Sequence, residues 1–205
     1  MRADSDLLPA GPGAACGRMG ISAPQHPVSC PAHIFIPSFA LLMVPIELEL
    51  KNFLSYGTDA PPLDFSRFEV ACLSGKNGQG KSALLDAMTW AVWGEARKSS
   101  GKRKPDDELI RIGTRHMEVS FVFQLEGERY RVTRSYSRSA TGKTTTSDLE
   151  FHIYVPEADR YRPLTGSTQR ETQATIDATL GLDYDTFINS AFLLQGRSDE
   201  FTQKR

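Results

Sequence analysis

The stretch that decides the fold is Gly75-Lys76-Asn77-Gly78-Gln79-Gly80-Lys81-Ser82. It satisfies the pattern G-x-x-x-x-G-K-[ST], which forms a phosphate-binding loop when a strand precedes it and a helix follows it. Before the loop, the apolar segment from Phe68 to Leu73 predicts a short strand. After it, apolar residues at helical spacing predict a helix from Ser82 to Glu95. These residues are Leu84, Leu85, Met88, Ala91 and Val92.

The residues of this loop are suited to hold a nucleoside triphosphate. Gly78 and Gly80 can adopt backbone angles closed to residues with a Cβ, so that successive N–H groups point inward. The first N–H groups of the helix and its dipole add to the attraction. Lys81 can reach the β- and γ-phosphates, and the Ser82 hydroxyl can ligate Mg²⁺. Gln79 and Ala83 complete this expected set, and the alternative is a glycine-rich turn before an ordinary core helix.

Composition sets broad limits on the class of protein. The 205 residues are 40% hydrophobic and 24% charged, which is typical of a globular protein. A formal net charge of −1 means that any contact with nucleic acid must come from a local basic patch. The three cysteines, Cys16, Cys30 and Cys72, lack metal-ligand spacing, and we expect Cys72 to be buried in its strand. A reducing cytoplasm fits this cysteine usage.

Residues 1–43 differ from the rest of the chain. They contain six prolines and few charges, so we expect a disordered or non-native extension that precedes a folded unit at 44–205. The apolar run from Ile34 to Val44 is too short to span a bilayer and is broken by Pro37. It also lacks the basic flank of a signal peptide. Our hypothesis is that Met43 is the physiological start of the protein.

Alternating residues predict an antiparallel sheet. Ile46, Leu48 and Leu50 alternate with charged residues, which predicts a half-buried strand after Pro45. Three further segments read as strands separated by glycine-containing turns, and together they predict an antiparallel meander. These segments are His116 to Leu125, Arg129 to Tyr136 and Asp148 to Val155.

Two groups of basic residues are candidates for DNA contacts. The loop from Arg97 to Lys104 holds five basic residues. In the middle strand of the meander, Arg129 and Arg131 are expected to share one side, with Arg134 as a further candidate. Either group can be a solvated surface, or it can contact DNA phosphates. The candidate DNA-binding residues are Lys102, Arg103, Lys104, Arg129 and Arg131.

The last part of the chain predicts two helices and a strand. Thr168 and Glu171 form a capping-box pattern for a helix that ends at Leu180, before Gly181. A second helix from Asp183 to Asn189 has Asp183 or Asp185 as its N-cap. The apolar run that starts at Ala191 predicts a buried strand, and the Gln195 at its end could point a carbonyl oxygen at Mg²⁺ or at the attacking water. No apolar strand in the sequence ends in an acidic residue, so the catalytic set is incomplete.

Together these segments resemble the N-terminal ATPase lobe of the SbcC-type DNA double-strand-break-repair ATPases, which are relatives of the SMC proteins within the ABC class of P-loop proteins. The resemblance covers about residues 43 to 205 and implies an α/β fold, an ABC-type P-loop ATPase lobe with an antiparallel β meander and helices packed on the sheet. The segments that carry it are Lys51-Asn52-Phe53, Gly75 to Ser82, Leu84-Leu85-Asp86-Ala87, Asp107-Glu108-Leu109-Ile110-Arg111 and Phe187 to Gly196.

The resemblance also implies roles for individual residues. Lys81 and Gln195 are the implied catalytic residues, and Ser82 and Gln195 attend Mg²⁺. Lys51 is expected to approach the phosphates of ATP, and Asn77 to lie close to the γ-phosphate. Members of the family continue into a coiled coil and a second lobe with the signature motif and the catalytic glutamate. We therefore expect this chain to be a fragment that cannot hydrolyse ATP by itself.

The implied partners are a second copy of the ATPase head, an SbcD-like nuclease and double-stranded DNA ends, in the cytoplasm at the nucleoid and without a membrane. ATP would be held between two heads whose closure gates the nuclease. Two alternatives from other classes stay open. One is a non-catalytic, nucleotide-dependent interaction module, and the other is the nucleotide-binding domain of an ABC transporter.

Overall fold

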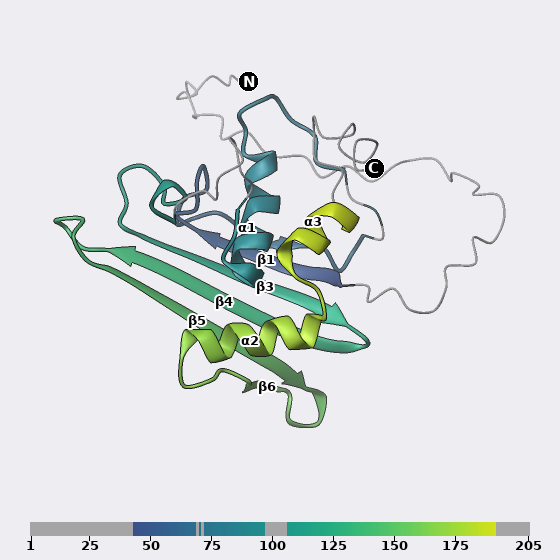
Figure 1. Ribbon diagram of the computed structural model, residues 1–205. Helices are drawn as coiled ribbons and strands as arrows, with labels where there is room; N and C mark the ends of the chain where they lie inside the picture. Colours follow the sequence, from purple (N-terminus) through teal and green to yellow (C-terminus); the bar gives the residue numbers. More distant parts are fainter. Residues whose placement is uncertain (1–42, 69, 71, 97–105, 192–205) are drawn as a thin grey trace, which may run out of the picture.

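A computed structural model of the protein describes residues 43–68, 70, 72–96 and 106–191. Its centre is a six-stranded antiparallel sheet with the strand order β2-β1-β3-β4-β5-β6 (Figure 1). The strands are β1 (Val44–Lys51), β2 (Leu63–Asp64), β3 (His116–Leu125), β4 (Glu128–Arg138), β5 (Thr145–Val155) and β6 (Arg160–Pro163). The helices are α1 (Lys81–Trp93), α2 (Gln169–Leu180) and α3 (Tyr184–Ala191), and short 3₁₀ turns lie at Asp106–Glu108 and Pro156–Ala158. The predicted α/β fold with helices on an antiparallel meander is confirmed.

The meander forms because its strands alternate and its turns are short. In β3, Met117, Val119 and Phe121 point into the core, while Glu118 and Ser120 between them stay partly exposed. Glu126 and Gly127 join β3 to β4, and both have positive φ angles, of 52° and 88°. Two consecutive positive φ angles are typical of a tight hairpin turn whose twist matches that of the strands.

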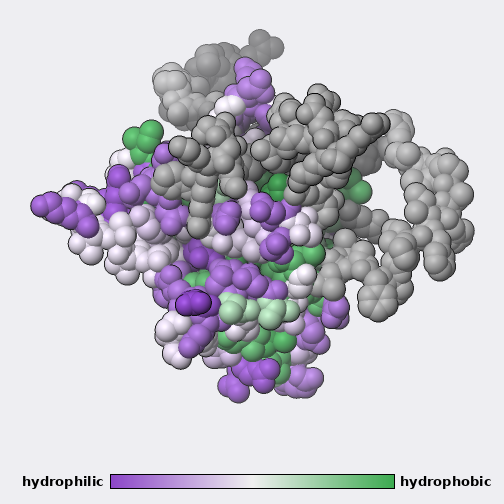
Figure 2. Space-filling view, viewed as in Figure 1, coloured by the Kyte–Doolittle hydropathy of each residue, from purple (hydrophilic) through white to green (hydrophobic). Residues whose placement is uncertain are grey.

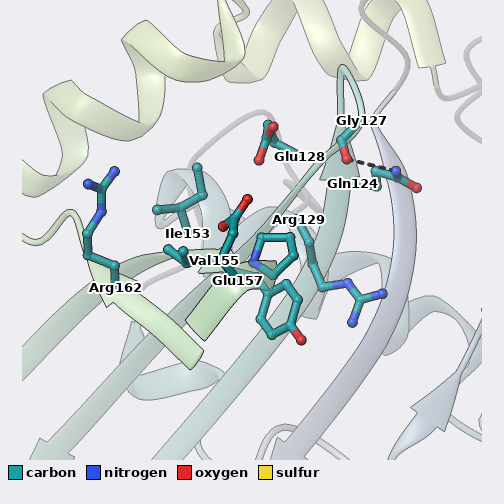
Figure 3. Close-up of a pocket in the computed structure, with 10 residues that line it drawn as sticks. Gln124, Gly127, Glu128, Arg129, Ile153, Val155, Glu157 and Arg162 are labelled. Carbon is teal, nitrogen blue, oxygen red and sulfur yellow. Dashed lines mark hydrogen bonds between the residues drawn. The ribbon is translucent and has the colours of Figure 1, made fainter. Parts of the chain in front are cut away.

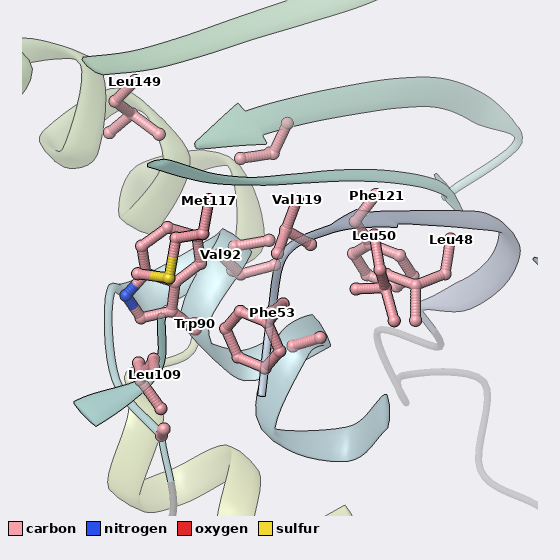
Figure 4. Packing of buried hydrophobic residues seen from close by; sticks show 14 of the residues in the cluster. Leu48, Leu50, Phe53, Trp90, Val92, Leu109, Met117, Val119, Phe121 and Leu149 are labelled. Carbon is pink, nitrogen blue, oxygen red and sulfur yellow. The ribbon is translucent and has the colours of Figure 1, made fainter. Parts of the chain in front are cut away.

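The core lies between α1 and the sheet. Trp90 of α1 is 1% exposed, and its ring lies 5.7 Å from that of Phe53, which follows β1 (Figure 4). The Trp90 indole Nε1 donates a hydrogen bond of 2.9 Å to Asp106 Oδ1, so its polar atom is satisfied at the edge of the core. The face of the molecule seen in Figure 2 shows hydrophilic and near-neutral residues with smaller apolar patches among them. Buried and more exposed residues alternate along much of β1 and β3 because the core covers one face of the sheet.

The strand predicted for Phe68 to Leu73 is wrong. Among the described residues of this segment, Leu73 takes part only in an isolated bridge and Val70 is 76% exposed. Cys72 is exposed, so the prediction that it is buried is also wrong. A strand forms only beside another strand, and in the described part of the chain the sheet ends at β2. An apolar run shows a tendency to form a strand but does not show whether a neighbouring strand is available.

The two helices predicted near the end of the chain are confirmed as α2 and α3. The Thr168 hydroxyl accepts a hydrogen bond from the backbone N–H of Glu171, and the capping box is complete at the start of α2. Gly181 ends that helix with a φ of 63°. Asp183 caps α3, because its Oδ1 accepts a 2.7 Å hydrogen bond from the N–H of Thr186. Ala191, the expected start of a strand, is instead the last residue of α3.

Several predictions concern residues that the structure does not describe. The extension at 1–42, the basic loop at 97–105 and the segment from 192 to 205 lie outside the described residues. Within the described ranges, no helix has the length and the apolar character needed to cross a membrane.

Candidate functional site

The phosphate-loop sequence leads directly into α1. Gly80 is the N-cap of this helix with a φ of 84°, and no side chain caps the first turn. The loop and the start of α1 line one wall of an open pocket of about 710 Å³, which is within the size range of ligand sites. The lining residues are Leu54, Ser55, Asn77, Gly78, Gly80, Lys81, Ser82, Ala83, Asp86, Glu108, Ile110 and Ile112.

Two glycines of the loop face different surroundings. Gly78 has a φ of 83°, and a Cβ added there would meet nothing within 4 Å. At Gly80, an added Cβ would lie 2.8 Å from Ser55 Oγ and 3.2 Å from Tyr56. The Tyr56 hydroxyl also donates to the carbonyl oxygen of Gly80 at 3.3 Å. Gly80 is therefore packed against the turn after β1, whereas Gly78 leaves open space for a ligand.

Lys81 and Gln79 make different contacts within the loop. Lys81 Nζ donates to the carbonyl oxygens of Gly75 and Lys76, at 2.7 and 2.8 Å, so its ammonium group lies across the loop. Gln79 Oε1 accepts a hydrogen bond of 2.8 Å from the N–H of Lys76, which is a contact between two residues of the loop itself. An ammonium group, an uncapped helix start and open space at Gly78 are what a chain of phosphates requires. The loop residues therefore fit a nucleoside triphosphate.

Two further chain segments, the turn after β1 and the segment before β3, also line the pocket. The N–H of Leu54 donates to Leu109 O at 2.7 Å, and the N–H of Arg111 donates to Asn52 O at 2.8 Å. The Arg111 guanidinium also donates to the carbonyl oxygen of Ser55. These bonds join the turn after β1 to the segment before β3. They bring Leu54, Ser55 and Ile112 to the pocket.

Lys51 lies elsewhere in the structure. Its Nζ donates a hydrogen bond of 2.8 Å to Glu118 Oε1 on the neighbouring strand and lies 3.4 Å from Glu49 Oε1. The hydrogen bond to Glu118 raises the pKa of Lys51 above its usual value. Lys51 is not among the residues that line the pocket, whereas Leu54 and Ser55 of the next turn are. A role for Lys51 at the phosphates stays a prediction, and it requires the side chain to leave Glu118.

Residues 47–205 match the AAA domain family. The chain belongs to this family. Over 155 residues it is 34% identical to the SbcC component of the SbcCD nuclease of Deinococcus radiodurans, in a match that covers 76% of this chain and 16% of the relative. Over 164 residues it is 32% identical to the same component in Staphylococcus aureus strain MRSA252, in a match that covers 78% of this chain and 16% of the relative. The resemblance to the SbcC-type ATPase lobe is thereby confirmed, and the chain spans about 16% of the length of these curated relatives.

Among solved structures, the recombination mediator protein RecF with ATP is similar to 63% of this chain. The match covers 30% of the RecF chain, with a TM-score of 0.41 and 18% sequence identity.

The AAA domain carries two of its candidate DNA-binding residues on the outer face of β4. Arg129 lies over the ring of Tyr154 at 5.2 Å, and Arg131 lies over the ring of Tyr161 at 4.1 Å. Figure 3 shows Arg129 at one side of a second open pocket, of about 460 Å³, with Arg162 at the other side. Both arginine side chains on β4 are therefore held in place by tyrosine rings, and Arg129 remains exposed.

Arg134 does not belong to this basic face of the AAA domain. It shares its side of β4 with the buried Val132, as the two-residue period of a strand requires. Its guanidinium donates to Ala91 O at 3.0 Å and to Gln173 Oε1 at 2.6 Å. The prediction that Arg134 is a further basic surface residue is wrong.

The candidate residues Lys102, Arg103 and Lys104 fall outside the described residues, as does Gln195. Their roles stay predictions. Sequence reasoning missed six pocket residues, which are Leu54, Ser55, Asp86, Glu108, Ile110 and Ile112. The motif from Asp107 to Arg111 is part of the resemblance, but nothing in its composition indicates that it borders the pocket.

Proposed function

We propose that this AAA domain binds ATP with Mg²⁺ and is the ATP-binding half of a DNA double-strand-break-repair ATPase. The observation that carries the proposal is the arrangement of Gly78, Gly80 and Lys81 at the uncapped start of α1. The sequence relatives are named as components of a nuclease, which supports a role in DNA processing.

In this proposal each part of the loop has a separate task. Backbone N–H groups from Gly78 to Ala83 bind phosphate oxygens, and the helix dipole of α1 adds to that attraction. The Lys81 ammonium exchanges its carbonyl partners for the β- and γ-phosphates, and Asn77 lies close to the γ-phosphate. The Ser82 hydroxyl, together with Gln195, would hold Mg²⁺, which when bound neutralises phosphate charge. Within the described residues, no cluster of three or more His, Cys, Asp or Glu side chains could hold a metal by itself.

We propose that the residues of this chain alone do not hydrolyse ATP. We propose that a second copy of the head completes the site, so that ATP holds the closed pair better than the open one. An SbcD-like nuclease acting on double-stranded DNA ends is the proposed partner. Lys51 and Gln195 are proposed to act only in that closed state.

The test uses the full protein together with its partner nuclease. Sedimentation velocity should show that ATP converts heads into pairs, and that Lys81→Ala no longer responds to ATP. The proposal is contradicted if the wild-type protein associates equally with and without ATP. ATP-dependent pairing without any hydrolysis would favour the second candidate, a non-catalytic, nucleotide-dependent interaction module.

DNA contact through Arg129 and Arg131 is proposed separately, together with Lys102, Arg103 and Lys104. Each phosphate contact that is lost should reduce the salt dependence of DNA binding by about one unit of the logarithmic slope. Changing Arg129 and Arg131 to Glu should therefore weaken binding and flatten its salt dependence. Lys143→Glu, in the exposed β4–β5 turn, is the matched control. If the double variant shows the same salt dependence of DNA binding as the wild type, Arg129 and Arg131 do not contact DNA.

A further inference from the structure

We infer that Gln79 is a positioning residue of the phosphate loop, which fixes the place of the Lys81 ammonium by holding the peptide group between Gly75 and Lys76. This inference rests on the proposed nucleotide binding. It assigns a task to a side chain that the phosphate-loop pattern leaves unspecified, because the pattern allows any residue at position 79.

The peptide group between Gly75 and Lys76 is held at both of its polar ends. Its carbonyl oxygen, Gly75 O, accepts a hydrogen bond of 2.7 Å from Lys81 Nζ. Its N–H, which belongs to Lys76, donates a hydrogen bond of 2.8 Å to Gln79 Oε1. A trans peptide group is planar, and its N–H and C=O point in opposite directions. Lys81 and Gln79 therefore hold one rigid plane from opposite sides.

Gln79 also contacts the second carbonyl group that binds Lys81. Lys81 Nζ donates to Lys76 O at 2.8 Å, and the backbone N–H of Gln79 donates to the same oxygen at 3.4 Å. Lys76 and Gln79 therefore exchange two hydrogen bonds, which close the turn between them. Both carbonyl groups that bind the Lys81 ammonium belong to peptide groups that Gln79 contacts.

The loop leaves room for the Gln79 side chain at Gly75. A Cβ on residue 75 would lie 2.6 Å from Gln79 Oε1, which is too close for two atoms that are not bonded. A side chain at position 75 would therefore push the Gln79 amide away from the N–H of Lys76. The first glycine of the motif is what lets Gln79 reach the backbone.

Loss of the Gln79 contact would release the Lys81 ammonium. The peptide group after Gly75 could then turn, because glycine allows many backbone conformations, and a turned group would point its N–H at the ammonium. A lysine that is already held in place loses less conformational entropy when its ligand arrives. Two of the three ammonium donors bind carbonyl oxygens, and the third can meet the first phosphate oxygen.

The first test measures the reactivity of the Lys81 amine in the full chain without nucleotide. Acetic anhydride modifies accessible lysine amines, and mass spectrometry gives the rate at each lysine. Gln79→Met has nearly the same size but lacks the acceptor oxygen, so it should raise the rate at Lys81 about fivefold, as expected when one hydrogen bond is lost. The rate at Lys143, an exposed lysine in the β4–β5 turn, should not change.

Two further variants serve as controls in the labelling test. Gln79→Glu keeps an acceptor oxygen, so labelling of Lys81 should stay as slow as in the wild type. Gln124→Met is the matched control, because Gln124 is also exposed and donates a 3.1 Å hydrogen bond to a backbone group three residues away, Gly127 O. Equal labelling rates at Lys81 in wild type and Gln79→Met would overturn the inference.

The second test asks by calorimetry whether Gln79 acts through Lys81. Gln79→Met should weaken Mg-ATP binding about fivefold, whereas Gln124→Met should not. Adding Gln79→Met to Lys81→Ala should change the affinity less than about twofold, because the group that Gln79 positions is already absent. A merely structural role would give the same loss in both backgrounds. That result, or an affinity of Gln79→Met equal to that of the wild type, would overturn the inference.

A failure of the proposed function gives a different result. If the wild-type chain does not bind Mg-ATP, the proposed nucleotide binding fails, and the labelling rates alone decide whether Gln79 holds Lys81. If the wild type binds Mg-ATP and Gln79→Met changes neither the labelling rate nor the affinity, only the inference fails. Thermal unfolding of each variant shows whether the fold has changed, which is not expected for an exposed side chain.

Discussion

Gly80 is the residue where the phosphate loop meets the rest of the molecule. Gly78 and Gly80 have nearly equal φ angles, of 83° and 84°, but only Gly80 is packed against Ser55 and Tyr56. An alanine at either position costs about 1–2 kcal/mol for its left-handed backbone. Gly80→Ala also creates a contact of 2.8 Å with Ser55 Oγ, which must be relieved.

We therefore expect Gly80→Ala to lower the free energy of unfolding by more than Gly78→Ala does. Urea unfolding of the two variants and the wild type measures this difference directly. Equal losses in both variants would mean that the turn after β1 does not support the loop.

His152 is expected to make stability depend on pH near neutrality. Burial lowers the pKa of His152 below 6.5, and the neighbouring Arg131 lowers it further, while Glu150 acts in the opposite direction. The unfolded state then binds the proton more readily than the folded state, so stability falls as the pH drops below about 6.5.

The thermal midpoint should therefore decrease between pH 7.5 and pH 5.5, and it should decrease less in His152→Gln. His116→Gln serves as the control, because His116 is exposed. The same pH dependence in wild type and His152→Gln would show that other groups cause the effect.

At the scale of elements, Arg134 joins three of them. It extends from β4, and its guanidinium donates to the carbonyl oxygens of Ala91 and Val92 at the end of α1 and to Gln173 of α2. A cation at a helix C-terminus is favourable, and hydrogen bonds to a charged group are stronger than neutral ones.

Arg134→Met should lower the free energy of unfolding by about 2 kcal/mol while leaving DNA binding unchanged. Arg131→Met is the matched comparison on the other side of the same strand, and it is expected to affect DNA binding more than Arg134→Met does. Denaturant unfolding and DNA titrations of both variants measure the two effects. A loss of DNA affinity in Arg134→Met at unchanged stability would contradict this assignment.

Elements whose signals are local could be predicted from the sequence. Thr168 and Glu171 cap α2 within four residues of each other, and the alternation in β1 needs no distant partner to be recognised. The strand expected at Phe68 to Leu73 depends on a neighbouring strand that the sequence pattern does not specify. Arg134 could have been placed by strict alternation with Val132, since a two-residue period allows no exception without a bulge.

The difference between local signals and distant contacts also explains which residues of the candidate site could be predicted from the sequence. The phosphate loop is a contiguous motif, so its residues are recognisable from the sequence. Leu54 and Ile112 are 58 positions apart in the sequence and reach the pocket through hydrogen bonds between two irregular segments. Leu54 has a φ of 49°, which is rare for leucine and has no signal in the sequence. Such contacts follow only from the folded chain.

At the scale of the whole molecule, α1 links the loop to the far side of the fold. Its first residues form the phosphate end of the pocket, and its last residue, Trp93, donates from Nε1 to Leu182 O at 3.2 Å. The Trp93 ring lies 4.6 Å from the ring of Phe187 in α3, the helix that precedes the segment with Gln195. The start of α1 at the phosphate loop is therefore connected, through α1 and Trp93, to the helix α3.

The central claim is that the loop from Gly75 to Ser82 binds ATP, and calorimetric titration of the full chain with Mg-ATP tests it most directly. We expect saturable binding by the wild-type protein and at least about tenfold weaker binding by Lys81→Ala, because a charge-assisted contact to the phosphates is lost. No binding by the wild-type protein, or equal affinities in wild type and Lys81→Ala, would contradict the claim.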